Sequence, residues 1–344
     1  MPNSLPLDSF LKSQSPIFDV RSPAEFNQGH IPGSISLPLF DDQERSIIGT
    51  AYKQESREIA IDLGLKIVGP KLFDLVNSAK QHIHNKEANI LCWRGGMRSG
   101  FVARLLESIG FNTSTLQGGY KSFRRDVLKS LENTSIPQLF ILGGFTGSGK
   151  TSILEQLNHL GEQVIDLEAI AGHRGSAFGL LGLPPQMSQE QFENKLAHTL
   201  KQLDLSKPIW IEDESRMIGK CRIPTALFDS MAQAKFIHID INKELRIQHL
   251  ISIYGNAPID ELVQSTTRIE RKLGIQLTNK IINLFINNDK ASAFDLLLTY
   301  YDKTYSHYLN QRKDKNLLKD LSMSFSQWAI YLRDLYQEQS KSKL

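Results

Sequence analysis

The chain has 344 residues, enough for two domains that each bury a core. Its 40% hydrophobic and 22% charged residues are ordinary for a soluble globular protein, and no apolar run reaches the length of a membrane span. The net charge of +3 neither requires nor excludes a nucleic-acid partner. Two cysteines cannot form a disulfide framework, no zinc-ligand spacing occurs, and the N-terminal residues lack a signal-peptide pattern, so we expect a cytoplasmic protein.

The first 130 residues alternate apolar strands with helical stretches. Residues 16–20 (PIFDV), 34–37 and 88–93 (ANILCW) are predicted strands, and 113–120 (TSTLQGGY) is a predicted strand and turn. The apolar residues that follow the third run recur on one helical face, and Gly110 lies where a glycine often ends a helix. This alternation predicts an α/β domain with a parallel sheet.

The segment CWRGGMRSG (92–100) places a cysteine in a loop between a predicted strand and a predicted helix. The thiolate is the reactive form of cysteine, and nearby cations or a helix N-terminus favour it. Glycines let backbone N–H groups turn inward, so the loop suits an anion beside the sulfur, and we expect Ser99 to cap the helix. The alternative is a buried structural cysteine. The predicted catalytic residues are Cys92 with an anion cradle of Arg94, Gly95, Gly96 and Arg98.

The polar segment LENTSIPQ (131–138) interrupts this pattern, so we place a domain boundary there, with domains at 1–130 and 138–344. Strands are expected at LFILGGF (139–145), QVIDLE (163–168), PIWIEDE (208–214) and KFIHIDI (235–241). From about Glu261 the chain is predicted to be mostly helical. We therefore expect a second parallel-sheet domain with a helical C-terminal part.

The segment GGFTGSGKTS (143–152) fits the Walker A pattern, and it follows a predicted strand and opens a helix as that pattern requires. Its backbone N–H groups can surround phosphate oxygens, Lys150 can reach a terminal phosphate, and Thr151 can ligate Mg²⁺. The pattern predicts a di- or triphosphate ligand without saying which. The predicted diphosphate-binding residues are Gly144, Gly147, Ser148, Gly149, Lys150 and Thr151.

Polar residues follow two other predicted strands of this domain. The acidic run after residue 211 is a Walker B candidate that could hold a metal, with a solvated turn as the alternative. DLEAIAGHRGSAFG (166–179) carries two acidic residues at a strand end and a glycine-flanked His-Arg pair, which suits closure on an anionic ligand. The predicted substrate-positioning residues are Asp166, Glu168, His173, Arg174, Glu212 and Asp213.

Two stretches of the first domain resemble the rhodanese family. DVRSPAEFNQGHIPGS (19–34) is similar to its first half, and CWRGGMR (92–98) is similar to its active-site loop. The resemblance covers about the first 125 residues and implies a sulfur or selenium atom carried on Cys92, with Asp19 and Arg21 bracing the loop. The C-x5-R loop is one residue longer than in common sulfur-transferring rhodaneses and is similar to the phosphatase branch, so either a phosphate is hydrolysed or a phosphate-bearing donor is accommodated.

Taken whole, the chain resembles the tRNA 2-selenouridine synthase family. The stretches that carry the resemblance are ERSIIGTAYKQ (44–54), CWRGGMRS (92–99), GGYKSFR (118–124), GGFTGSGKT (143–151), DLEAIAGHRGSAFG (166–179), EDESRMIG (212–219) and YYDKTY (300–305). The family's reaction implies that geranyl diphosphate alkylates the sulfur of wobble 2-thiouridine in tRNA. Selenophosphate then supplies selenium, held by Cys92 as a perselenide, while the Walker A loop binds the diphosphate.

The resemblance also implies partners and further sites. We expect tRNA as the partner, a selenophosphate supplier as a second candidate, no membrane, and no tightly bound cofactor beyond Mg²⁺ at the Walker A loop. Three rival functions stay open from the residues: an ATP-dependent kinase or NTPase, a cysteine phosphatase, and a non-enzymatic tRNA-binding protein. Phe145, Phe178 and Leu180 are candidate walls of an isoprenoid trough. The candidate tRNA contacts are Lys121, Arg124, Arg125, Arg268, Arg271 and Lys272.

Overall fold

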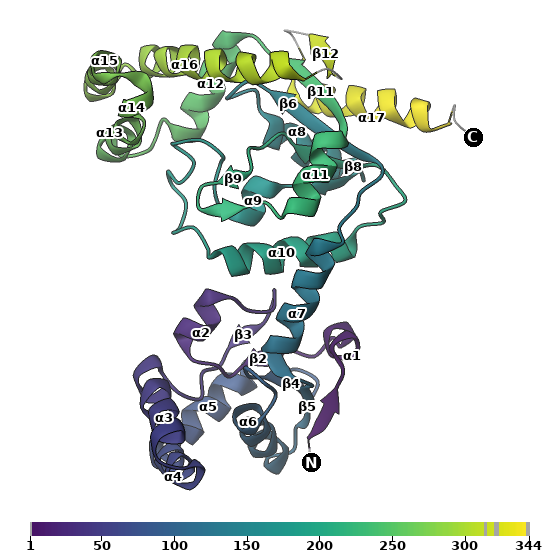
Figure 1. Ribbon diagram of the computed structural model, residues 1–344, viewed down its shortest axis with the longest axis vertical. Coiled ribbons are helices and arrows are strands. Elements are labelled where there is room, and N and C mark those ends of the chain that lie inside the picture. The colour runs from purple at the N-terminus through teal and green to yellow at the C-terminus, as the bar shows by residue number, and fades with distance from the viewer. Residues whose placement is uncertain (1, 313–314, 320–322, 342–344) are drawn as a thin grey trace. The chain divides into compact units, whose positions relative to one another are not determined.

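The computed structural model describes residues 2–312, 315–319 and 323–341, which divide into two compact units (Figure 1). The first unit contains the residues up to Leu131 and the segment Glu190–His198, and the second contains the remaining described residues. The division lies at the start of the polar segment 131–138. Nothing in the sequence indicates that Glu190–His198 belongs with the first unit, because those contacts are made by ordinary polar residues far along the chain.

The first unit is built on a five-stranded parallel sheet with the order β1-β5-β4-β2-β3. Its strands are β1 (Asn3–Leu5), β2 (Ile17–Asp19), β3 (Ile35–Ser36), β4 (Glu87–Leu91) and β5 (Asn112–Leu116). The helices that connect them are α1 (Leu7–Lys12), α2 (Pro23–Gln28), α3 (Asp42–Gln54), α4 (Arg57–Val68), α5 (Leu72–Lys80), α6 (Met97–Ser108) and α7 (Gly119–Glu132), with a 3-10 turn at Gly69–Lys71.

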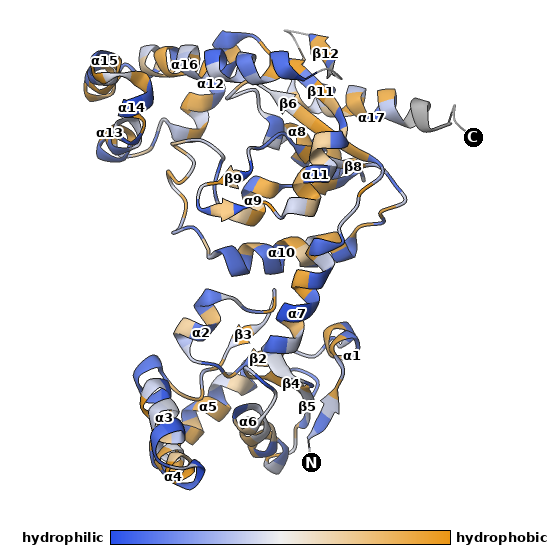
Figure 2. Ribbon diagram, in the orientation of Figure 1, coloured by the Kyte–Doolittle hydropathy of each residue, from blue (hydrophilic) through white to orange (hydrophobic). Residues whose placement is uncertain are grey.

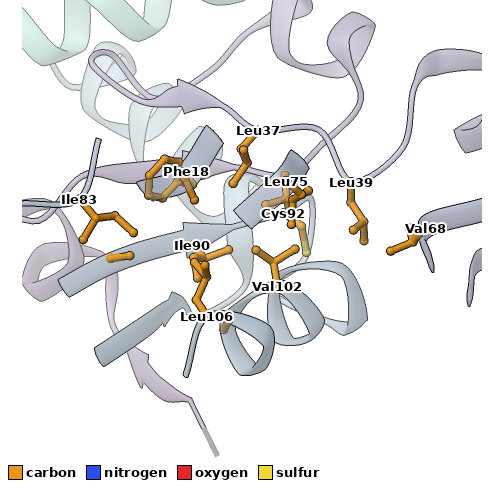
Figure 3. Close-up of a cluster of buried hydrophobic side chains, with 14 of the residues drawn as sticks. Phe18, Leu37, Leu39, Val68, Leu75, Ile83, Ile90, Cys92, Val102 and Leu106 are labelled. Atoms are coloured by element: carbon orange, nitrogen blue, oxygen red, sulfur yellow. The ribbon is translucent and has the colours of Figure 1, made fainter. Parts of the chain in front are cut away.

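The core of the first unit forms between the strands and their helices. Phe18 on β2 and Ile90 on β4 are fully buried, and Val102 and Leu106 of α6 pack against them (Figure 3). Helices cover the parallel sheet, and β2 and β4 accordingly contain short apolar runs, whereas β5 is largely polar in sequence. The same cluster includes Cys92, at the carboxyl end of β4.

The second unit contains another five-stranded parallel sheet, with the order β12-β11-β6-β8-β7. Its strands are β6 (Leu139–Gly144), β7 (Gln163–Ile165), β8 (Ile209–Glu212), β11 (Lys235–Asp240) and β12 (Lys315–Lys319). Every residue of β6 is buried, and Figure 2 shows this strand as largely hydrophobic. This sheet confirms the predicted α/β class.

From Glu261 onward the described residues are mostly helical, as predicted, and the short strand β12 is the exception that the sequence did not indicate. Residues 315–319 pair with all of Phe236–Asp240 on β11. A five-residue segment with two leucines has no strong preference of its own, so pairing with a preformed strand decides its conformation. The local sequence could not show this pairing.

Helices and one small hairpin complete the second unit. The helices are α8 (Lys150–His159), α9 (Leu167–Ala171), α10 (Gln189–Gln202, of which Glu190–His198 groups with the first unit), α11 (Thr225–Gln233), α12 (Lys243–Tyr254), α13 (Ile259–Arg268), α14 (Glu270–Leu273), α15 (Ile275–Ile286), α16 (Lys290–Gln311) and α17 (Phe325–Lys341). β9 (Met217–Ile218) and β10 (Cys221–Arg222) form the antiparallel pair. Among the described residues, no helix is long and apolar enough to span a membrane.

Candidate active site

The cysteine loop (residues 92–96) joins β4 to α6 in the first unit. Cys92 is only 3% exposed and lies among Leu75, Val102 and other apolar side chains (Figure 3). Its Sγ lies 3.2 Å from the Oγ of Ser99. Ser99 therefore does not cap α6 as expected. Gly96 occupies the N-cap position without a side-chain hydrogen bond, and the buried Ser99 hydroxyl lies beside the thiol.

Two glycines bring the cysteine loop against the turn before α7. Gly119 has φ of +60°, and a Cβ placed there would lie 2.3 Å from the carbonyl oxygen of Cys92. Gly95 has φ of +67°, and a Cβ there would lie 2.4 Å from the carbonyl oxygen of Leu116. Only glycine tolerates both the close approach and the left-handed backbone. The stretch GGY at 118–120 therefore packs directly against the backbone of the cysteine loop.

The first turn of α7 supplies hydrogen bonds to this loop. The backbone N–H of Tyr120 donates to the carbonyl of Cys92 at 2.9 Å, and that of Lys121 donates to the carbonyl of Trp93 at 3.0 Å. These N–H groups have no partner within the helix, because the first turn of a helix leaves them free. The backbone of the cysteine loop is thus fixed from both sides.

The two arginines predicted to hold an anion differ in their surroundings. The guanidinium of Arg98 donates to Glu25 at 2.6 Å. Burial would raise the pKa of Glu25, but the hydrogen bond and charge of Arg98 outweigh it and lower the pKa below its usual value. Arg94 is exposed and has no ion-pair or hydrogen-bond partner among the described residues. Of the two, Arg94 is the guanidinium available to an anion.

A buried ion pair lies behind the loop. Arg21 and Asp19 are fully buried and joined at 2.6 Å, and Arg21 also donates to the carbonyl of Gly29 at 2.6 Å. The guanidinium carbon of Arg21 lies 3.8 Å from the centre of the Tyr120 ring. Buried and joined to each other, these residues are placed to brace the structure around Tyr120 rather than to react, although the Nη1 of Arg21 has no hydrogen-bond partner among the described residues.

The segment Glu190–His198 completes this network. The hydroxyl of Tyr120 donates to Glu190 at 2.6 Å and accepts from the side-chain amide of Asn194 at 2.8 Å. Asn194 also donates to the carbonyl of His30 at 3.1 Å, and Arg124 forms an ion pair with Glu193. The sequence gives no signal for these contacts, which join positions about 70 and more residues apart.

The phosphate loop (residues 144–151) lies between β6 and α8 in the second unit. Gly147 and Gly149 have φ of +79° and +72°, as a tightly turned loop requires. The Nζ of Lys150 lies 3.1 Å from the carbonyl oxygen of Gly144, and Ser148 is buried. The strand, loop and helix predicted from the Walker A pattern are all present.

The phosphate loop opens into a cavity of about 970 Å³ within the second unit. Asp166, Glu168, His173, Arg174 and Asp213 line the cavity, so five of the six predicted substrate-positioning residues come together beside the loop. The carboxyl ends of parallel strands meet at one edge of a sheet, which explains why β6, β7 and β8 deliver their residues to one place. Glu168 lies within α9 and not at a strand end as expected, since Asp166 caps that helix by accepting from the N–H of Ala169.

Glu212 is the predicted residue that does not line the cavity. It is 1% exposed and accepts a hydrogen bond from the backbone N–H of Glu168 at 2.8 Å. Burial and the neighbouring carboxylates raise its pKa well above the usual value. Its neighbour Glu214 lines the cavity instead, and burial, followed by the charge of Glu168, raises the pKa of Glu214 to about 8.

The acidic residues do not by themselves define a metal site. Among the described residues, no group of three or more His, Cys, Asp or Glu side chains has an arrangement that could hold a metal ion. Thr151, the residue expected to ligate Mg²⁺, donates its hydroxyl hydrogen bond to Glu168 at 3.1 Å. The chemistry of a Thr hydroxyl beside carboxylates would suit Mg²⁺, with Thr151 and Glu168 as the residues to hold it.

The His-Arg pair shapes one wall of the cavity. His173 is 8% exposed, and burial lowers its pKa. Arg174 donates to the carbonyl of Leu181 at 2.7 Å. Gly175 has φ of +63°, and a Cβ there would lie 2.7 Å from Glu214. The glycine therefore lets this loop approach the carboxylates.

The apolar wall of the cavity differs from the sequence expectation. Phe145, Phe178 and Leu180 do not line it: Phe178 packs in the helical core, and the Phe145 ring lies edge-on to His238 and Tyr305. Residues of a helical core and of an apolar cavity wall are both hydrophobic, so the sequence alone could not tell which role these three residues have. The apolar and aromatic residues that do line the cavity are Leu183, Phe228, Leu250, Ile253, Tyr254, Tyr301, Tyr305 and Tyr308.

The basic residues predicted to contact tRNA fall into two groups. Arg124 is held by Glu193 and Asn194. The other five are exposed: Lys121, Arg125, Arg268, Arg271 and Lys272. Exposure is compatible with phosphate contact but equally with a solvated face, so these five remain a prediction.

Comparisons with known proteins cover both units. Residues 7–126 match the family model of the rhodanese-like domain, and residues 137–334 match that of the tRNA 2-selenouridine synthase AAA domain. The tRNA 2-selenouridine synthase of Shewanella denitrificans is 33% identical over 97% of this chain and 98% of its own length. The protein of the same name from Shewanella piezotolerans is 33% identical over 92% of this chain and 95% of its own. The full-length tRNA isopentenylpyrophosphate transferase of Bacillus halodurans aligns with 60% of this chain and 98% of its own, at 10% identity and a TM-score of 0.34.

Proposed function

Because this chain belongs to the tRNA 2-selenouridine synthase family, we propose that it replaces the sulfur of wobble 2-thiouridine in tRNA by selenium in two steps. The family membership makes the protein an enzyme of tRNA modification and sets aside a free-standing phosphatase or a binding-only role. The two steps use geranyl diphosphate and selenophosphate. Each of the two units offers a loop with the chemistry that one step needs.

The first step is alkylation of the thiocarbonyl sulfur. The sulfur attacks C1 of geranyl diphosphate, the C–O bond to the diphosphate breaks, and the N3 proton of the base leaves with the diphosphate. Alkylation converts a poor leaving group into a thioether that can depart later. Lys150 and the N–H groups of the phosphate loop would stabilise the negative charge that develops on the diphosphate.

The observation that carries this step is the composition of the cavity in the second unit. A phosphate-binding loop forms one side, and apolar side chains such as Leu250, Ile253 and Phe228 form another. A ligand with a diphosphate head and a hydrocarbon tail has both features.

The second step is exchange of the alkylated sulfur for selenium. Selenium from selenophosphate takes the place of sulfur at C2, geranyl thiol leaves, and one water releases the phosphate. We assign Cys92 and Arg94 to this step, because the thiol lies under a loop whose N–H groups and exposed guanidinium suit a phosphate-bearing donor. Because Cys92 is 3% exposed, this assignment requires that its thiol become more accessible when the donor binds.

Nucleoside mass spectrometry tests both assignments. In a bacterial strain without its own enzyme, grown with selenite, the wild-type chain should produce 2-selenouridine in tRNA. Cys92→Ser should leave S-geranyl-2-thiouridine without selenouridine, whereas Lys150→Ala should leave 2-thiouridine alone.

Two matched variants act as controls. Cys221→Ser removes the other thiol, which is buried in the second unit, and Lys207→Ala removes an exposed lysine of that unit. Both should behave as wild type. Normal selenouridine in Cys92→Ser, or normal geranylation in Lys150→Ala, would contradict the corresponding assignment.

A further inference from the structure

The helix α16 contributes a side chain to the start of the phosphate loop. The hydroxyl oxygen of Tyr305 accepts a hydrogen bond from the backbone N–H of Gly144 at 3.1 Å. The same hydroxyl donates to Oδ2 of Asp213 at 2.8 Å. One hydroxyl thus joins the end of β6 to the residue that follows β8.

The loop is tied to α16 a second time through α12. Arg246 is 4% exposed and donates to the carbonyl of Thr146 at 3.1 Å. The same guanidinium donates two hydrogen bonds, at 2.8 and 2.7 Å, to the carboxylate of Asp302. Asp302 lies on α16, one turn before Tyr305. Two positions of the loop, Gly144 and Thr146, are therefore fixed by side chains of the same helical pair.

We propose that Tyr305 is a positioning residue that holds the phosphate loop in its ligand-binding form. The inference rests on the proposed function, in which this loop receives the diphosphate. A loop with three glycines in eight residues loses much backbone freedom when it must become ordered. When the loop is ordered in advance, the ligand does not have to compensate for that loss, and it binds more tightly.

The geometry distinguishes Tyr305 from Tyr300 and Tyr308 on the same helix. Tyr308 also donates to Asp213, at 3.1 Å, but it is 38% exposed and has no hydrogen bond to the loop. Tyr300 does not line the cavity. Burial raises the pKa of Tyr305, so its hydroxyl keeps the proton that it donates to Asp213.

Binding of inorganic pyrophosphate to the full chain, measured by calorimetry, tests the proposal. Removing the hydroxyl in Tyr305→Phe leaves the N–H of Gly144 without its partner and should weaken binding about 10-fold. Tyr300→Phe, the same change on the same helix, should stay within about twofold of wild type. Tyr308→Phe removes a hydrogen bond to Asp213 but none to the loop, so it should weaken binding less than Tyr305→Phe does. Unchanged binding in Tyr305→Phe, or an equal loss in Tyr308→Phe, would overturn the role assigned to the loop contact.

Steady-state geranylation separates positioning from a merely structural role. In Tyr305→Phe the KM for geranyl diphosphate should rise about 10-fold while kcat stays within about twofold, as expected when ground-state and transition-state binding are lost equally. A fall in kcat at unchanged KM would contradict the proposal.

Hydrogen exchange keeps the inference testable apart from the proposed function. The amide of Gly144 in the ligand-free protein should exchange faster in Tyr305→Phe than in wild type and Tyr300→Phe. Should wild type itself fail to bind pyrophosphate, the proposed function is wrong, and the exchange of Gly144 still decides whether Tyr305 fixes the loop. Equal exchange in all three proteins would refute the inference.

Discussion

The cysteine loop and the phosphate loop share one design and differ in what holds them. Each follows a parallel strand, contains at least one glycine with positive φ, and opens a helix. Backbone groups at 116–121, soon after the cysteine loop in sequence, fix that loop. Side chains from α12 and α16, 95 or more residues downstream, fix the phosphate loop. Backbone groups of the next strand and helix therefore hold the cysteine loop, whereas the phosphate loop depends on side chains of helices far along the chain.

The surroundings of the two loops differ as well. Cys92 is 3% exposed among apolar side chains, whereas the phosphate loop faces a cavity of about 970 Å³. Under the proposed function, such burial shields the sulfur from oxidation, and the open, partly apolar cavity has room for a diphosphate with a hydrocarbon tail.

The largest effect is expected when the cysteine loop loses the close approach of Gly119. Gly119→Ala places a methyl group 2.3 Å from the carbonyl oxygen of Cys92, so the loop must move. We expect loss of about 3 kcal/mol in unfolding free energy and no measurable selenouridine. Gly110→Ala is the matched control: φ is +90°, but no atom lies within 4 Å, so only the backbone strain of about 1 kcal/mol remains. Equal losses in the two variants, in urea unfolding, would show that the contact is unimportant.

The corresponding change in the phosphate loop should affect ligand binding more than stability. In Gly149→Ala the new methyl group would lie 2.3 Å from the ring of Phe325, which can shift more easily than backbone. Because alanine is also strained at φ of +72°, the loop should be distorted, and we expect pyrophosphate binding to weaken about 30-fold. Gly161→Ala, with φ of +87° and open space, should bind as wild type. Calorimetry that finds equal affinities for both variants would contradict this reading of the loop.

A smaller effect is expected from the segment Glu190–His198. Asn194→Ala removes the amide that donates to Tyr120 and to the carbonyl of His30, and should cost about 2 kcal/mol of unfolding free energy. Selenouridine formation should fall while geranylation is kept, because these contacts lie in the first unit. Lys195→Ala serves as the control on the same helix. A parallel loss of both steps would show that the segment does not act on the cysteine loop alone.

The smallest effect concerns the pH dependence around Arg98. The pKa of Glu25 is lowered in the folded protein, so its contribution to stability is present above its unfolded value near 4.5 and is lost as the pH falls through the folded value. Glu25→Gln should be less stable than wild type at pH 7, by about 1 kcal/mol. The difference in unfolding free energy between the variant and wild type should become smaller below pH 4.5, as measured by urea titrations at several pH values. A gap that stays constant down to pH 3 would show that the charge of Glu25 does not matter.

Much of the candidate site could be predicted because its residue types occur at short, regular spacings in the sequence. The Walker A glycines and Lys150 predicted a loop between strand and helix, and CWRGGMR predicted a thiol in a glycine-rich turn. Five of the six predicted positioning residues line one cavity, since strand ends at one edge of a parallel sheet converge. The prediction for Glu212 was wrong because its side chain is buried and does not line the cavity. The spacing of residues along the sequence does not show which way such a side chain points.

The sequence by itself determined the two α/β folds, the cysteine loop and the phosphate loop, because apolar periodicity and glycine spacing act over a few residues. Only the tertiary structure decided that β12 is a strand, that Glu190–His198 joins the first unit, and that Tyr305 contacts Gly144. These features depend on which surfaces meet after the chain has folded. A polar or aromatic residue has the same letter whether it faces solvent, a core or a loop 161 positions away.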